Sequence, residues 1–342
     1  MRIWFNKTFS SISSVFNNMK QANVDGGVTI ICTHTNPAAS AFLAADEAMV
    51  EPAGLIGKDY LAWCLNFCQH QKIDYFWPAK ESVMIVRNQA DFAHFGTHVI
   101  AVAIPEVLTL LNNKGEFYRT LPSTVAQAME CIAVTNKVAF DHAVSVLSQH
   151  HAILCVKPAV SVFGLGFRIL DTQRSSIMHL LNGVEYEIPL AELRAGMEGI
   201  NQFPELLVME HLAGVEWSVD CAGNSGQLLC AIQRKKHPQA GYGQEIDNNH
   251  DIHIMVERLT THYRLNGLFN IQFKARADGE PRLLEINPRP AGGFGMACLA
   301  GVNLAEVFLQ SLMGKKIVVI PPIRYGLRVS EVSTSVVLQS LV

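Results

Sequence analysis

Apolar and polar residues alternate in blocks along the first third of the chain, and these blocks predict strands and helices in turn. Short β-branched apolar runs predict strands, and apolar residues at helical spacing predict helices. The expected strands cover residues 2–5, 27–34, 73–78 and 98–104, and the expected helices cover 8–22, 38–49 and 58–71. Strands that alternate with helices form parallel sheets covered on both faces, so residues 1–120 predict a doubly wound parallel α/β domain.

The pattern changes in the rest of the chain, where strands follow one another directly. Expected strands cover residues 152–158, 206–214, 216–223 and 227–236, and expected helices cover 251–265 and 303–313. Residues 268–289 predict a hairpin, because Asp278-Gly279 separates two apolar runs and this dipeptide favours a tight turn. The second part of the chain is therefore predicted to be mainly antiparallel α+β.

The second strand of this hairpin, in the stretch LLEINPRPAGG at 283–293, carries polar groups at alternate positions. Glu285, Asn287 and Arg289 share one face, because a strand points alternate side chains to opposite faces. With Gln272 of the first strand they offer the oxygen ligands that Mg²⁺ prefers, and Arg289 offers a phosphate contact. The alternative is a surface strand with a structural ion pair.

Two further residues are candidates for nucleotide contacts. Lys157 ends an apolar strand before a turn that contains Gly164 and Gly166, so its charge and the free N–H groups of the turn suit a phosphate. Glu216 follows a strand and a short turn, where a carboxylate suits ribose hydroxyls. The alternatives are a solvated lysine and an ordinary hairpin. The basic cluster at 233–238 is either a further phosphate contact or a solvated turn.

Composition narrows the class of protein. The 342 residues are 49% apolar and 17% charged, which predicts two or three folded domains and excludes disorder. The formal net charge of -3 argues against a nucleic-acid partner. The eight cysteines form no metal-binding pattern and predict reduced thiols. The first residues contain no signal-peptide apolar segment, and no apolar run reaches about 18 residues, so we expect a cytoplasmic protein without a membrane span.

The order of these residues resembles the ATP-grasp superfamily, most closely its carbamoyl-phosphate-synthase-like and carboxylate–amine ligase branch. The most specific part is FNIQF…LLEINPR, and ADEAMVEP, QKIDYFWPAKE and TNKVAF are also similar, so the resemblance covers residues 27–315. NPRPAGG followed by AGVNL resembles the ATP-grasp proteins encoded with tellurium-resistance gene clusters.

The resemblance implies a fold in three segments. Residues 1–120 would form an N-terminal Rossmann-like pre-ATP-grasp domain, 121–205 the lid or small subdomain, and 206–342 the C-terminal subdomain with the metal site. The interval from Lys137 to Lys157 is shorter than the family's, and the turn after Lys157 has fewer glycines. We therefore expect a shortened lid subdomain.

The resemblance also implies a role for each candidate residue. Lys157 and Lys137 would bind phosphates, with Lys157 and Arg289 acting on the transferring phosphoryl group. Residues Met209, Glu210, His211 and Leu212 would form a hinge whose backbone pairs with adenine, Leu284 would line the adenine slot, and Glu216 would bind ribose. The ligands of Mg²⁺, or of Mn²⁺ in its place, would be Gln272, Glu285 and Asn287.

The implied function is an ATP-dependent ligase that phosphorylates a small carboxylic acid and couples the acyl phosphate to an amine, releasing ADP and phosphate. The acceptor would face Gly292, Gly293 and Gly295, and a homodimer is the default assembly. Three alternatives stay open: a nucleotide-binding module without turnover, an enzyme that forms carboxy- or carbamoyl phosphate, and an NAD-dependent Rossmann enzyme. The last is disfavoured because the first turn, NKTFSS, lacks G-x-G-x-x-G.

Overall fold

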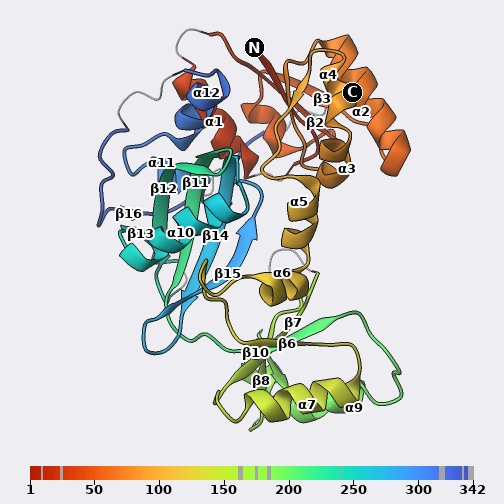
Figure 1. Ribbon diagram of the computed structural model, residues 1–342, viewed down its shortest axis with the longest axis vertical. Coiled ribbons are helices and arrows are strands. Elements are labelled where there is room, and N and C mark those ends of the chain that lie inside the picture. The colour runs from red at the N-terminus through yellow and green to blue at the C-terminus, as the bar shows by residue number, and fades with distance from the viewer. Residues whose placement is uncertain are drawn as a thin grey trace. The chain divides into compact units, whose positions relative to one another are not determined.

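The computed structural model describes residues 1–8, 11–23, 26–160, 165–173, 176–182, 186–239, 241–315, 320–332 and 335–337 (Figure 1). The chain divides into two compact units. The first unit comprises Met1–Thr109, Glu216–Gln272 and Ile286–Val342, and the second comprises Leu110–Val215 and Phe273–Glu285. The three-segment division at residues 120 and 205 stays a prediction. Gly164 of the expected phosphate turn lies outside the described residues.

The N-terminal sheet of the first unit is parallel and has the strand order β3-β2-β1-β4-β5. Its strands are β1 (Arg2–Phe5), β2 (Thr29–His34), β3 (Glu47–Val50), β4 (Tyr75–Trp77) and β5 (His98–Val99). The accompanying helices are α1 (Ile12–Ala22), α2 (Gly57–Gln71), α3 (Ser82–Arg87) and α4 (Gln89–Ala93). Side chains alternate between the two faces along β1. Trp4 therefore packs with residues of α2, whereas its neighbours Ile3 and Phe5 pack with residues of α1. The predicted doubly wound parallel sheet is therefore confirmed.

Residues 38–49 do not form the helix that we expected. The segment contains a short 3₁₀ helix, η1 (Ser40–Ala44), and then β3. Asp46 explains the difference, because its N–H donates to the Ile30 carbonyl at 2.9 Å and its carboxylate accepts the Ile30 N–H at 2.8 Å. Pairing with β2 thus outweighs the local helix propensity of the alanines. The expected strand at 98–104 is also shorter, ending at Val99 before α5 (Pro105–Asn112).

The second unit contains a sheet with the order β6-β10-β7-β8-β9, antiparallel except between β8 and β9. Its elements are α6 (Lys114–Thr120), β6 (Cys131–Val134), α7 (Lys137–Leu147), β7 (Leu154–Pro158), β8 (Arg168–Asp171), α8 (Ser176–Asn182), β9 (Glu187–Pro189), α9 (Leu190–Gly196) and β10 (Leu206–Glu210). Leu154, Val156 and Val208 pack with residues of α7 and α9 in one core. The strand period of two therefore turns Lys157 and Met209 to the opposite face of this sheet.

A third sheet has the order β15-β14-β11-β12-β13-β16. Its elements, with the helices of this part of the chain, are β11 (Glu216–Asn224), β12 (Gln227–Lys236), β13 (Gln244–Asp247), α10 (His250–His262), β14 (Gly267–Ala275), β15 (Pro281–Asn287), α11 (Phe294–Cys298), α12 (Leu304–Leu312) and β16 (Arg328–Val329). The predicted hairpin is confirmed as β14 and β15, and Gly279 has the positive φ of 92° that its turn requires. The antiparallel pairs of β11, β12 and β13 confirm the α+β prediction.

The cysteines and helix lengths also bear on the sequence predictions. All eight cysteines are free thiols, and six of them are buried, as expected for a protein that uses thiols as small apolar side chains. Among the described residues, no helix is both long enough and apolar enough to cross a membrane.

Candidate functional site

Lys157 of the second unit is held by a tyrosine that the sequence analysis did not identify. The Lys157 Nζ donates a hydrogen bond to the Tyr118 Oη at 3.1 Å and lies 5.3 Å from the centre of its ring. The Tyr118 hydroxyl in turn donates to the backbone carbonyl of Leu284. The predicted phosphate lysine and the predicted adenine-slot leucine are thus joined through one phenol from α6.

Glu285, next along β15, also contacts α6. Its Oε2 lies 3.5 Å from the Lys114 Nζ, and the two side chains are 29% and 12% exposed. The structure therefore brings Lys157, Lys114, Tyr118 and Glu285 into one cluster of the second unit. Lys114 and Tyr118 are spaced i, i+4 on α6, but nothing in the local sequence marks a helix face that contacts a strand far along the chain.

Burial changes the charge balance in this cluster. Burial, and then the charge of the nearby Lys114, lower the pKa of Lys157 to about 8, although the Glu285 charge acts in the opposite direction. Burial and the Glu285 charge raise the pKa of Tyr118, so its phenol stays protonated and able to donate. A lysine with a lowered pKa beside a carboxylate is typical of functional sites.

The hinge residues predicted to contact adenine present their side chains in two directions. Met209 pairs with Cys155 in the sheet register and shares the face of Lys157, whereas Glu210 pairs with Leu154 and lies on the opposite face. Backbone hydrogen bonds already join the Glu210 N–H to Glu130 and the His211 N–H to Ile153, at 3.0 Å each. Adenine contact by the Met209–Leu212 backbone stays a prediction.

The Glu210 carboxylate is 3% exposed and anchors the hinge to other parts of the second unit. Arg276 donates to both of its oxygens, at 2.7 and 2.9 Å, and the Glu130 N–H donates at 2.9 Å. Burial alone would raise the pKa of Glu210, but the bonds from Arg276 and Glu130 keep it below its usual value. The side chain therefore holds the hinge in place, a role that the sequence did not suggest.

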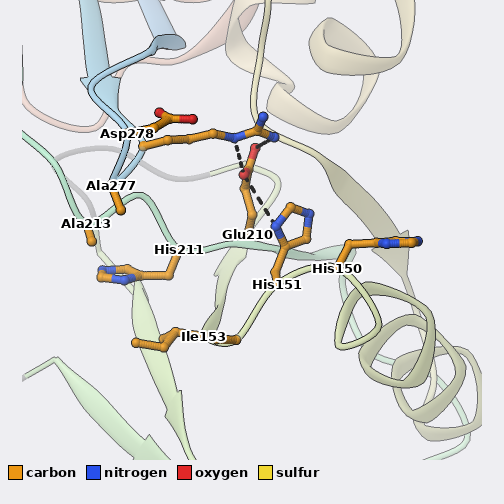
Figure 2. Close-up of a pocket in the computed structure, with 10 residues that line it drawn as sticks. His150, His151, Ile153, Glu210, His211, Ala213, Ala277 and Asp278 are labelled. Atoms are coloured by element: carbon orange, nitrogen blue, oxygen red, sulfur yellow. Dashed lines mark hydrogen bonds and ion pairs between the residues drawn. The ribbon is translucent and has the colours of Figure 1, made fainter.

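A cavity of about 440 Å³ opens beside this anchor, lined by His150, His151, Ala152, Ile153, Glu210, His211, Ala213, Arg276, Ala277 and Asp278. In Figure 2, His151 and Glu210 point toward one another, and His150 and His211 extend to opposite sides. The His151 Nε2 lies 2.7 Å from the Glu130 carboxylate. Burial, and then the Lys274 charge, lower the pKa of His211. The cavity thus adjoins the Glu210 anchor, and Lys157 is not among the residues that line it.

The other predicted phosphate lysine, Lys137, begins α7 in the same unit. Its Nζ pairs with the Asp141 carboxylate at 2.8 Å, and Asp141 also accepts a hydrogen bond from Arg194 at 2.7 Å. Both members of the Lys137–Asp141 pair are about one-third exposed. An exposed ion pair can rearrange at little cost, so a phosphate contact by Lys137 stays a prediction.

The remaining candidates lie in the first unit. Glu216, the predicted ribose ligand, forms an ion pair with Lys236, a member of the basic cluster. Gln272 is partly buried within β14, and Asn287 is partly buried as the last residue of β15. Arg289 donates to the Pro290 carbonyl at 3.1 Å. Ile286 is 3% exposed and points into the core, so its neighbours Glu285 and Asn287 share the opposite face of the strand, as predicted.

Gly293, in the loop expected to face the acceptor, approaches a buried arginine. A Cβ at this position would overlap the Arg234 Nη1 and would lie 2.7 Å from the Met296 Cε. Arg234 is fixed by Asp220, at 2.8 Å, and by Ser218. Packing against Arg234 is therefore one reason for glycine at 293.

Gly293→Ala is expected to lower the free energy of unfolding by about 1–3 kcal/mol, the usual cost of overpacking. Arg234 cannot move aside without breaking its bonds to Asp220 and Ser218. The matched control is Gly292→Ala, because nothing lies within 4 Å of a Cβ at 292. Urea unfolding of both variants checks this prediction, and equal losses of stability would contradict it.

The donor set suits magnesium that arrives with a nucleotide. Among the described residues, no three His, Cys, Asp or Glu side chains are grouped so that they could hold a metal ion. Magnesium is commonly bound through one or two carboxylates plus substrate phosphates, with water at the other positions. The Glu285 carboxylate fits that chemistry. Its joint action with the amides of Gln272 and Asn287 stays a prediction, and zinc would require His or Cys instead.

Comparisons with known proteins bear on the family and the fold. Residues 202–335 match the family model described as ATP-grasp in the biosynthetic pathway with Ter operon. No curated protein matches the chain. Among solved structures, N5-carboxyaminoimidazole synthetase from Staphylococcus aureus, complexed with ADP, is 14% identical with a TM-score of 0.66, over 92% of this chain and 78% of that one.

Two further structures have the same fold. The biotin carboxylase domain of 2-oxoglutarate carboxylase from Hydrogenobacter thermophilus is 12% identical, with a TM-score of 0.62 over 92% of this chain and 70% of that one. L-amino acid ligase from Bacillus licheniformis is 10% identical, with a TM-score of 0.59 over 91% of this chain and 73% of that one. The resemblance to the ATP-grasp superfamily is thereby confirmed: the chain has the ATP-grasp fold behind an N-terminal parallel α/β domain, and its residues 202–335 match the Ter-operon family.

Proposed function

We propose that the protein is an ATP-dependent ligase that phosphorylates a small carboxylic acid and couples the acyl phosphate to an amine. The observation that carries this proposal is the cluster of Lys157, Tyr118, Lys114 and Glu285, in which two ammonium groups and a carboxylate meet at the end of an apolar strand. Phosphate groups and a divalent cation need this combination of charges. The ATP-grasp fold and the ligases among its structural relatives support the same reaction class.

Each candidate residue would have the role that the resemblance implies. Lys157 would bind the phosphates, with Lys137 as a second contact, and Arg289 would stabilise charge on the transferring phosphoryl group. Glu285, Gln272 and Asn287 would hold Mg²⁺, or Mn²⁺ in its place, which supplies charge neutralisation to the phosphate oxygens when bound. The backbone of Met209–Leu212 and the side chain of Leu284 would hold adenine, and Glu216 would bind ribose.

The proposed reaction has two balanced steps. A carboxylate oxygen of the acid attacks the γ-phosphorus, the bond to the bridging oxygen breaks, and ADP leaves. The amine nitrogen then attacks the acyl carbon, the bond from carbon to the phosphate oxygen breaks, and the amine loses a proton. The products are an amide, ADP and phosphate. Water must be excluded from the acyl phosphate during this sequence.

The direct test is phosphate release from Mg-ATP with a library of amino acids and small carboxylic acids, each with and without an amine. Release that depends on one acid and one amine is the expected result. MgADP binding is measured separately by calorimetry. Binding without turnover under any pairing would replace the ligase by the nucleotide-binding module. Release with bicarbonate in place of an organic acid would indicate the carboxy-phosphate alternative.

The pH profile of ATP use should follow Lys157. Its pKa near 8 means that the ammonium is present below pH 8 and is lost as the pH rises through that value. The charged form attracts phosphate, so kcat/KM for ATP should fall above about pH 8, by up to tenfold per pH unit. Steady-state rates from about pH 6 to 10 measure this fall in kcat/KM, which is the alkaline limb of the pH profile.

Two variants test the assignment of that limb. Lys157→Arg keeps its charge over the whole range, so the limb should disappear. Tyr118→Phe removes the hydroxyl that accepts the hydrogen bond of the Lys157 ammonium. That bond favours the charged lysine, so the limb should move to lower pH. An unchanged limb in Lys157→Arg would assign it to another group.

A further inference from the structure

Helix α6 presents two polar side chains to adjacent residues of β15, within the second unit. Lys114 contacts the Glu285 carboxylate, and Tyr118 donates to the Leu284 carbonyl. The two residues are spaced i, i+4 and therefore lie on one face of the helix. The family resemblance assigned no role to this helix, and its contacts were visible only in the structure.

The position of α6 is well fixed. The Asn113 side chain accepts the Glu116 N–H as an N-cap at 3.1 Å, and the Lys114 N–H donates to the Ala159 carbonyl at 3.0 Å. A Cβ on Gly115 would lie 2.6 Å from the Glu205 Oε2, so the helix packs closely against this neighbour. Lys114 is thus directed at Glu285 by a rigid element and is not a mobile surface lysine.

The charges around Glu285 have opposite consequences for a metal ion and for a nucleotide. The Lys114 Nζ is 3.5 Å from the Glu285 carboxylate, and its charge also acts on Lys157. A divalent cation that binds Glu285 alone must approach the Lys114 ammonium, and like charges at short range repel one another. Phosphate groups would be attracted by both lysines, so the cluster favours a metal that carries phosphates with it.

We propose that Lys114 is a built-in counter-cation of Glu285, which opposes binding of the free metal ion and turns to the phosphates when the metal–nucleotide complex binds. The proposal makes Lys114 a further nucleotide-binding residue and explains why a single carboxylate can serve as a site for nucleotide-borne metal. It rests on the proposed function only in taking Glu285 as a metal ligand.

The decisive variant is Lys114→Met, which removes the charge and keeps most of the apolar stem. Mn²⁺ binding to the nucleotide-free protein, titrated by electron paramagnetic resonance, should strengthen about three-fold or more, since a repelling charge is lost. MgADP binding, measured by calorimetry, should weaken by a similar factor, because a phosphate contact is lost. These opposite signs separate the proposal from a purely structural role, which would weaken both.

Three controls make the result interpretable. Lys114→Arg keeps the charge and should bind Mn²⁺ and MgADP as the wild type does. Lys58→Met removes an exposed lysine of α2 and should change neither affinity. In the Glu285→Gln background, Lys114→Met should no longer strengthen Mn²⁺ binding, because the coupling between the two residues is gone.

The outcomes distinguish this inference from the proposed function. Mn²⁺ affinity that is unchanged or weaker in Lys114→Met, with a wild-type unfolding temperature, overturns the counter-cation role. Failure of the wild-type protein to bind MgADP or ATP analogues at all overturns the proposed function instead. If Lys114→Met does not fold, Lys114→Arg is compared with the wild type in the Mn²⁺ and MgADP titrations. Because arginine keeps the charge, an altered Mn²⁺ affinity in that variant counts against the proposal.

Discussion

Glu285→Gln is expected to reduce Mg-ATP-dependent phosphate release by about a thousand-fold, the scale on which loss of transition-state charge stabilisation acts. The neutral amide keeps the shape of the side chain but removes the only full negative charge among the proposed ligands Gln272, Glu285 and Asn287. Without it, the metal and the transferring phosphoryl group lose their fixed position on β15. Single-turnover release of phosphate at saturating Mg-ATP measures the effect.

The fold should tolerate this change, because the Glu285 side chain is 29% exposed and its ion pair with Lys114 is not deeply buried. The unfolding temperature therefore separates loss of chemistry from loss of structure. Glu198→Gln, an exposed carboxylate of the same unit, is the matched control and should retain full activity. Near-normal turnover by Glu285→Gln would remove this residue from the metal site and, with it, the main support for the proposed mechanism.

Asp220→Ala is expected to cost the largest loss of stability, about 3–5 kcal/mol, because it leaves a buried guanidinium without its counter-charge. Asp220 and Arg234 form an ion pair at 2.8 Å with side chains that are 0% and 2% exposed. Asn270 also donates to Asp220, at 3.2 Å, and would keep only its two other acceptors, Ser218 and the Val219 carbonyl. Urea unfolding followed by circular dichroism measures the change in free energy.

A surface ion pair provides the comparison for that result. Asp141→Asn breaks the Lys137–Asp141 contact, whose members are 34% and 35% exposed, and should cost less than about 1 kcal/mol. The double change Asp220→Leu with Arg234→Met removes both buried charges and should recover part of the loss. A loss in Asp220→Ala as small as that in Asp141→Asn would mean that Arg234 is effectively solvated.

The sequence by itself determined the features that depend on local pattern. The parallel N-terminal sheet followed from alternating blocks, and the hairpin followed from Asp278-Gly279 between apolar runs. The period of two along β15 already placed Glu285 and Asn287 on one face, and the apolar strand before Lys157 already fixed its position at a strand end. These features need only neighbours in the chain, whose geometry is set by backbone stereochemistry.

Only the tertiary structure decided which distant groups meet. Tyr118 reaches Leu284, 166 residues away, and Arg276 binds Glu210 across 66 residues. Pairing with Ile30 likewise turned the expected helix at 38–49 into η1 and β3. The predicted adenine hinge shows the same division: a strand over its first residues was predictable, whereas the contacts of the Glu210 side chain with Arg276 and Glu130 were not. Long-range contacts depend on how whole elements pack, and local residue preferences are too weak to specify that packing.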